Sequence, residues 1–219
     1  MKKLDIGFFL INVILVLSLF ITPAIAEAVE KNLNLDQKVR SFLNNHRGQW
    51  VDWNVPEADG RVLYDLIIRH KYKRAVEIGT STGHSAIWMA WALSKTGGKL
   101  ITIEIDEERH QKALANFAAA GLSDFIDARL ADAHKLVLEL AGPFDFVFSD
   151  ADKGWYKNYF IALESKLEVG GCFTAHNATS GFGAGINDFL EYVQNLPNFM
   201  TAINTASPAG ISISYKLSD

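Results

Sequence analysis

The stretch AVEIGTSTGHSAIWMAWAL, residues 75–93, joins a short apolar run, a turn with two glycines and a second apolar segment. The run at 75–78 predicts a buried strand, and residues 85–93 predict a helix. Gly79 and Gly83 allow a tight turn and a close approach of the backbone to a ligand. A strand, a glycine turn and a helix in this order are typical of a parallel α/β sheet.

The same alternation continues along the rest of the chain. Further strands are predicted at 100–105, 125–130, 144–149 and 172–175, helices at 35–50, 56–67, 107–120, 135–140, 156–167 and 186–194, and a closing hairpin at 199–204 and 211–216. Strand and helix in strict succession predict a mostly parallel sheet with helices on both faces. Ligands of such sheets bind at the carboxyl ends of the strands, so we expect the functional motifs there.

Composition and charge bound the function. A chain of 219 residues is long enough for one domain with a sizeable core. Its net charge of -4 gives no electrostatic footprint for nucleic acid, so we expect no nucleic-acid partner. The single cysteine, Cys172, rules out an internal disulfide.

The N-terminal residues differ from the rest. Lys2 and Lys3 precede an apolar run at 6–21, and the sequence Ala-Ile-Ala at 24–26 follows it. This pattern predicts that residues 1–26 are a secretory signal peptide, or else a membrane anchor that tethers the chain through 6–21. Both alternatives place the domain at 27–219 outside the cytoplasm, periplasmic or extracellular. A cytoplasmic location stays open.

Acidic residues beside the first two strands indicate a nucleoside ligand. Glu77 precedes the loop from Gly79 to Ser85, where it would repel a pyrophosphate and attract a cationic amino group. Glu104 ends the second strand and can accept two hydrogen bonds from a ribose diol. Together they predict S-adenosylmethionine as the cofactor. A nicotinamide oxidoreductase is disfavoured, because the central glycine of G-x-G-x-x-G is missing.

A weaker signal follows the third strand. Asp132 and the backbone of Ala133 could contact an adenine edge. Asp132 is equally suited to cap the helix that begins there.

The stretch DADKGWYKNY, residues 150–159, follows the fourth strand, and His176 and Asn177 follow the fifth. Asp150, His176 and Asn177 therefore converge on one edge of the sheet, where carboxylate, imidazole and amide groups can bind a divalent cation. Lys153 could then accept the proton of an acceptor hydroxyl. The alternatives are a solvated turn and a surface lysine.

Residues from about 56 to 216 resemble the cation-dependent O-methyltransferases of the caffeoyl-CoA and catechol type. The resemblance is carried by VPEADGRVL, EIGTSTGHS, IEID and DADKGWYKNY. It implies a Rossmann-like class I methyltransferase fold with a seven-stranded sheet and a reversed C-terminal β-hairpin. It also implies that Gly79, Ser81 and Ser85 line the cofactor loop, Glu104 binds ribose, Asp150 binds metal, Asp152 lies near the cofactor and Lys153 is the base.

One position departs from the family pattern. The family has Asp-Asn where this chain has His176-Asn177, which replaces an anionic hard ligand with a neutral, softer one. This favours Mn²⁺, Fe²⁺ or Zn²⁺ over Mg²⁺, or means that the metal has been lost.

The sequence therefore predicts an O-methyltransferase that acts on a small hydroxylated, catechol-like or phenolic acceptor. The alternative is a noncatalytic nucleoside-binding or interaction domain on the same fold. The caffeoyl-CoA type further implies a homodimer.

Overall fold

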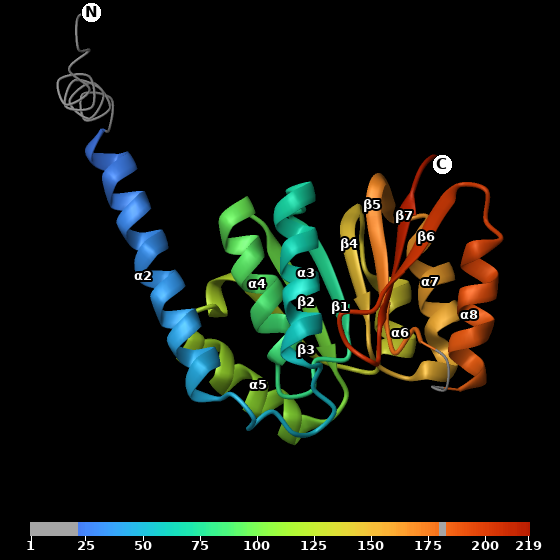
Figure 1. The fold of residues 1–219 in the computed structure, drawn as a ribbon, viewed down its shortest axis with the longest axis horizontal. Helices are drawn as coiled ribbons and strands as arrows, with labels where there is room; N and C mark the ends of the chain where they lie inside the picture. The colour runs from blue at the N-terminus through green and yellow to red at the C-terminus, as the bar shows by residue number, and fades with distance from the viewer. Residues whose placement is uncertain (1–21, 180–182) are drawn as a thin grey trace, which may run out of the picture.

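The computed structural model describes residues 22–179 and 183–219 and contains one seven-stranded sheet (Figure 1). Its strands are β1 (Arg74–Ile78), β2 (Lys99–Glu104), β3 (Ile126–Leu130), β4 (Phe144–Ser149), β5 (Leu167–His176), β6 (Phe199–Asn204) and β7 (Ile211–Lys216). They lie in the order β3-β2-β1-β4-β5-β7-β6. The first five strands are parallel, whereas β7 pairs antiparallel with β5 and β6. The predicted α/β sheet with its reversed hairpin is confirmed.

Helices cover both faces of this sheet. They are α2 (Pro23–Asn45), α3 (Glu57–His70), α4 (His84–Thr96), α5 (Glu107–Ala120), α6 (Ala133–Glu139), α7 (Tyr156–Glu164) and α8 (Ala184–Gln194), with short 3₁₀ turns η1 (Ser123–Phe125) and η2 (Lys153–Trp155). Successive side chains of a strand point to opposite faces, so β4 serves two cores. Phe146 and Phe148 pack with α3 and α4, while Val147 packs with α7 and α8.

Several predicted boundaries are wrong, and the strand predicted at 172–175 begins at Leu167. The helix predicted at 156–167 ends at Glu164, and Leu167 instead begins β5 and pairs with Phe144. Leu167 is buried in either arrangement, so apolar spacing could not distinguish them. The helix predicted at 35–50 runs from Pro23 to Asn45 instead. It begins where Thr22 accepts a hydrogen bond from the backbone N–H of Ile25.

Helix α2 leads away from the sheet at its N-terminal end (Figure 1). Val39 and Phe42, near its C-terminal end, are buried against the body, whereas residues 25–34 are all exposed. The apolar run at 6–21 lies outside the described residues, and α2 continues through the predicted cleavage position after Ala26. Among the described helices, none has the length and apolar character needed to span a bilayer. Signal peptide and anchor both stay predictions.

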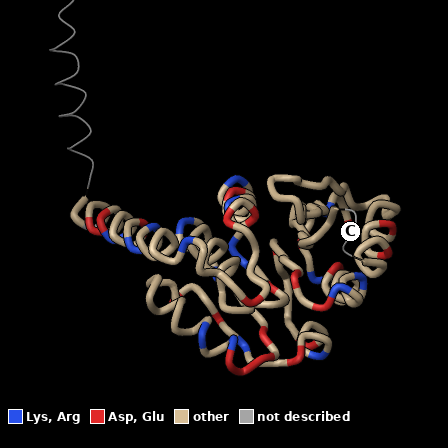
Figure 2. Tube along the Cα trace, turned by 60° about the horizontal axis from the view of Figure 1, so that its bottom comes forward, with Lys and Arg blue, Asp and Glu red and all other residues tan. Residues whose placement is uncertain are grey.

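Charged residues of both signs are interspersed along α2 and over the other helices (Figure 2). Several form local pairs, such as Lys112 with Glu108 and Arg61 with Glu57. Such exposed pairs contribute little to stability, about 0–1 kcal/mol each. The fold is therefore held mainly by the two apolar cores.

Candidate active site

A cavity of about 760 Å³ opens at the carboxyl ends of β1, β2, β4 and β5. It is lined by ten of the predicted site residues: Gly79, Ser81, Glu104, Asp132, Ala133, Asp150, Asp152, Lys153, His176 and Asn177. This is the position where open α/β sheets bind ligands. Three predicted residues, Glu77, Gly83 and Ser85, do not line it.

The loop after β1 approaches the loop after β4 closely. Gly79 has a φ angle of 98°, and a Cβ atom added to it would lie 2.9 Å from the backbone oxygen of Asp150. Only glycine therefore fits between the two loops. The backbone N–H of Ser81 donates to Glu104 Oε2 over 2.7 Å, which ties the loop to the end of β2.

Glu104 faces the cavity from the end of β2 and is largely buried. Besides the bond from Ser81, its Oε1 accepts hydrogen bonds from the backbone N–H groups of Ile105 and Asp106, each 3.0 Å long. These three donors fix the carboxylate in one orientation. A carboxylate has about four acceptor positions, so Oε2, which accepts only one of these bonds, can still accept a hydrogen bond from a ligand hydroxyl.

Glu77 and Ser85 lie behind the loop. Ser85 Oγ and Thr102 Oγ1 both donate to the Glu77 carboxylate, which is fully buried. Burial raises the pKa of Glu77 to about 8, although the two hydroxyl donors act in the opposite direction. Gly83 packs against Phe117, whose ring lies 2.5 Å from the position of an added Cβ. These three residues shape the loop from behind the cavity wall.

His134 and Tyr159 give the cavity an aromatic wall. The ring of His134 stacks on Trp155 with 3.8 Å between ring centroids, and its Nε2 lies 3.4 Å from Asp152 Oδ2. Asp132 caps α6 by accepting a hydrogen bond from the backbone N–H of His134. The prediction that Asp132 caps this helix is therefore confirmed, and Asp132 also lines the cavity. No pattern in the sequence indicates a role for His134.

Trp53 also lines the cavity, and no pattern in the sequence indicates it. Its side chain is 84% exposed, and its backbone has a left-handed φ of 64°. The segment is held by Asn54, which donates to Thr82 Oγ1 over 2.8 Å, and by a bond from Ser81 Oγ to the backbone oxygen of Asp52. Trp53 thus gives the cavity an indole surface that could contact a planar acceptor.

The carboxylate of Asp150 contacts two basic side chains, Lys153 and His176. Its Oδ1 lies 2.5 Å from Lys153 Nζ and 3.2 Å from His176 Nδ1. Lys153 Nζ also donates to the hydroxyl of Tyr156 over 2.9 Å. Asn177 follows with a left-handed φ of 60° and lines the same cavity. The predicted grouping of Asp150, Lys153, His176 and Asn177 is present.

His176 contacts a second carboxylate. Its Nε2 lies 2.8 Å from Oδ2 of Asp59, a fully buried residue of α3. Burial lowers the pKa of His176, but the hydrogen bonds with Asp150 and Asp59 outweigh it and raise the pKa to about 9. From the sequence, Asp59 is predicted only to lie in the first turn of a helix, and no pattern predicts its contact with His176.

Asp150, His176 and Asn177 offer a divalent cation only a partial ligand set, because Asp150 Oδ1 already pairs with Lys153 Nζ and both ring nitrogens of His176 face carboxylates. Asp150 Oδ1 and His176 Nδ1 lie side by side, and a ligating histidine typically has its other nitrogen bound to a carboxylate, as Asp59 provides. Within residues 22–179 and 183–219, no three His, Cys, Asp or Glu side chains are grouped to hold a metal. Asn177 and water would therefore complete the ligand set.

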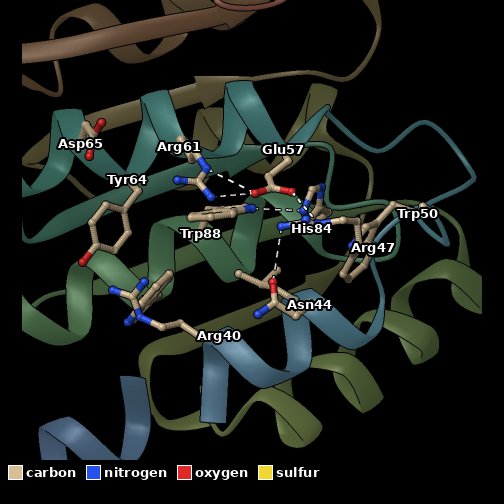
Figure 3. Close-up of a pocket in the computed structure, with 13 residues that line it drawn as sticks. Arg40, Asn44, Arg47, Trp50, Glu57, Arg61, Tyr64, Asp65, His84 and Trp88 are labelled. Carbon is tan, nitrogen blue, oxygen red and sulfur yellow. Dashed lines mark hydrogen bonds and ion pairs between the residues drawn. The ribbon is translucent and has the colours of Figure 1, made fainter. Parts of the chain in front are cut away.

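A smaller cavity of about 310 Å³ lies between α2, α3 and α4 (Figure 3). Glu57 pairs there with Arg47 over 3.4 Å and with Arg61 over 2.8 Å. Arg40 lies 4.9 Å from the centre of the Trp91 ring. The Arg40 contact joins α2 to α4, and the pair of Arg47 with Glu57 joins the segment after α2 to α3, so these side chains have a structural role.

Known proteins resemble this chain in sequence and in structure. Residues 26–200 match the model of the O-methyltransferase family. A catechol O-methyltransferase from Niastella koreensis is 41% identical over 49% of this chain. The match covers 50% of that protein's own length. Caffeoyl-CoA O-methyltransferase 1 from Eucalyptus globulus is 32% identical over 72% of this chain and 68% of its own.

Solved structures agree in fold. An O-methyltransferase from Bacillus cereus, in complex with SAH, gives a TM-score of 0.70 at 24% identity and covers 82% of this chain and 90% of its own. A structure described as a putative O-methyltransferase from Klebsiella pneumoniae gives a TM-score of 0.69 at 25% identity. The match covers 84% of this chain and 90% of that one. The chain therefore belongs to the O-methyltransferase family, whose members among these relatives are catechol and caffeoyl-CoA O-methyltransferases.

Proposed function

We propose that this chain transfers the methyl group of S-adenosylmethionine to a hydroxyl of a small catechol-like or phenolic acceptor, assisted by a divalent cation. The observation that carries the proposal is that Glu104, Asp150 and Lys153 line one cavity at the carboxyl ends of the strands. The names of the catechol and caffeoyl-CoA relatives support this class of acceptor.

The cofactor would lie along the loops after β1 and β2. Glu104 would accept the ribose hydroxyls, since its carboxylate is fixed and faces the cavity. Ser81 and Gly79 would bring the backbone close to the ligand, and Ala133 would border the adenine. Asp152 would face the cofactor from the loop after β4, beside the stacked His134.

The acceptor hydroxyl would lie near Lys153. In its neutral amine form, Nζ would take the hydroxyl proton. The oxygen would then form a bond to the methyl carbon as the bond from that carbon to sulfur breaks, leaving S-adenosylhomocysteine. Asp150, His176 and Asn177 would hold the cation, whose charge makes the hydroxyl more acidic. Tyr156 accepts a hydrogen bond from Nζ, which holds Lys153 at the cavity.

The test is methyl transfer from labelled S-adenosylmethionine to catechol, after chelation and after adding back Mg²⁺, Mn²⁺ or Zn²⁺. Lys153→Ala should lower turnover by about 10²–10⁴, the usual share of general-base catalysis, and leave cofactor affinity unchanged. Glu104→Ala should weaken cofactor binding by about 1.5–3 kcal/mol, because hydrogen bonds to a charged acceptor are lost.

Lys157→Ala is the matched control, since Lys157 pairs with Asp188 on α8 and does not line the cavity. Full activity of Lys153→Ala would refute the proposed base. Tight cofactor binding without turnover on any acceptor would identify the noncatalytic binding domain instead.

A further inference from the structure

The cavity between α2, α3 and α4 is lined by one face of each helix (Figure 3). Residues at i, i+4 and i+7 lie on the same face of a helix. At that spacing the lining is polar and aromatic: Arg40, Asn44 and, just beyond α2, Arg47; Glu57, Arg61 and Tyr64 on α3; His84, Trp88 and Trp91 on α4. Aromatic surface with a few polar groups is typical of a ligand site.

The floor of this cavity is formed by two buried indole rings. Trp88 and Trp91 lie with 5.7 Å between their ring centroids, and the Tyr64 ring lies 4.9 Å from that of Trp91. The N–H groups of both indoles are already used, since they donate to His84 Nε2 and to Asp36 Oδ1. The floor therefore offers apolar ring surface, and the polar groups of a ligand must be bound by the rim.

The rim of the cavity carries an excess of positive charge. Three arginines, Arg40, Arg47 and Arg61, face two acids, Glu57 and Asp65. Glu57 pairs with both Arg47 and Arg61. Within residues 22–179 and 183–219, Arg40 forms no ion pair, and neither does the exposed Asp65. One guanidinium at the rim is therefore available to an anion from outside.

The Arg40 guanidinium is held in place without using its N–H groups. It lies 4.9 Å from the centre of the Trp91 ring, and Figure 3 shows it facing the same end of the cavity as the Tyr64 hydroxyl. Asp36, one turn earlier on α2, is already paired with Lys95 over 2.5 Å. A guanidinium presents its donors as a fork that matches the two oxygens of a carboxylate.

This cavity is separate from the active-site cavity. The two share no lining residue. The chain from Trp50 to Asn54 runs between them, because Trp50 stacks on His84 with 4.4 Å between ring centroids, while Trp53 and Asn54 line the active-site cavity. Binding of S-adenosylmethionine and its acceptor therefore does not explain the arginines and indoles of the smaller cavity.

We propose that the cavity between α2, α3 and α4 binds a small aromatic carboxylate, with its ring against Trp88 and Trp91 and its carboxylate on the Arg40 guanidinium. The volume of about 310 Å³ lies at the lower end of small-molecule sites, roughly 300–1,000 Å³, which suits a ligand with one ring. The single unpaired guanidinium matches a single negative charge. The inference goes beyond methyl transfer and does not depend on it.

The test is calorimetric titration of cinnamate, which has one ring, one carboxylate and no hydroxyl to methylate, into the full chain. Arg40→Gln should weaken binding by about 10–100-fold, because hydrogen bonds between charged groups are lost. Arg40→Lys should weaken it less, since the charge stays and only the fork is lost. Arg69→Gln, at an exposed position in the last turn of α3, should match the wild type. Melting temperatures show that the variants are folded, and Arg40→Lys serves if Arg40→Gln is unstable.

Two further ligands separate the ring from the charge. Acetate lacks the ring and cinnamamide lacks the charge, so each should bind at least about 10-fold more weakly than cinnamate. A carboxylate in the active-site cavity would instead pair with Lys153, so Lys153→Ala should leave the affinity for cinnamate unchanged. A wild type that does not bind cinnamate would overturn the proposal. So would equal affinities of the wild type and the Arg40 variants, a loss confined to Lys153→Ala, or acetate that binds as tightly as cinnamate.

Discussion

Glu77 is a carboxyl group that the fold keeps away from water. Burial raises its pKa from 4.5 to about 8 in the folded chain. The folded state therefore holds the proton more tightly than the unfolded state does. This contributes stability that is fully present below pH 4.5 and is lost as the pH rises through about 8.

Glu77→Gln should remove this loss, because glutamine does not titrate. Between about pH 5 and 9, the melting temperature of the cofactor-free protein should fall less steeply in the variant than in the wild type. Each unit of pKa shift corresponds to about 1.4 kcal/mol of unfolding free energy. Glu108→Gln, at an exposed position on α5, is the control. Parallel curves for wild type and Glu77→Gln would contradict the assignment.

Single residues also show the limits of the sequence. Glu104, Asp150 and Lys153 could be found because each lies at or just after the end of a strand, and the ends of parallel strands meet at one edge. Asp59 could not, since its partner His176 is 117 positions away and an acid in the first turn of a helix is ordinary. Glu77 was placed at the ligand because it adjoins the glycine loop, yet its side chain points to Ser85 and Thr102.

At the scale of elements, the first turn of α8 packs directly against η2, the turn that contains Lys153. A Cβ atom added to Gly185 would lie 2.5 Å from the backbone oxygen of Lys153 and 2.7 Å from Cα of Gly154. Neither atom belongs to a flexible side chain. The position of Lys153 therefore depends on a glycine in another helix.

Gly185→Ala should displace η2 and lower methyl transfer by up to about 10²-fold, since small misplacements near reacting groups are costly. Cofactor affinity should change much less, because Glu104 and the loop after β1 are untouched. Steady-state kinetics and calorimetry measure the two effects. Asn187→Ala, exposed on the same helix, controls for the helix propensity of alanine. Unchanged turnover in Gly185→Ala would show that the turn adapts.

At the scale of the whole molecule, alternation of strand and helix was enough to predict the parallel sheet, its closing hairpin and the edge that carries the site. The reversed direction of the hairpin was implied by the family resemblance. The segment 51–54 was beyond prediction, because the left-handed backbone at Asp52 and Trp53 depends on hydrogen bonds to the loop after β1. The start of α2 was also missed, since its first two turns lack a buried face and so lack the apolar spacing that marks a packed helix.

The uneven contacts of α2 have a consequence for amide hydrogen exchange. Residues 25–34 are exposed, and helices shorter than about 12–15 residues are marginal in water without packing. Backbone amides of this half should exchange far faster than those at 39–45 when followed by mass spectrometry. Equal protection along α2 would mean that a partner, such as a second copy, covers Ile25, Val29 and Leu33. Without one, the helix opens often enough for a protease to reach the bond between Ala26 and Glu27.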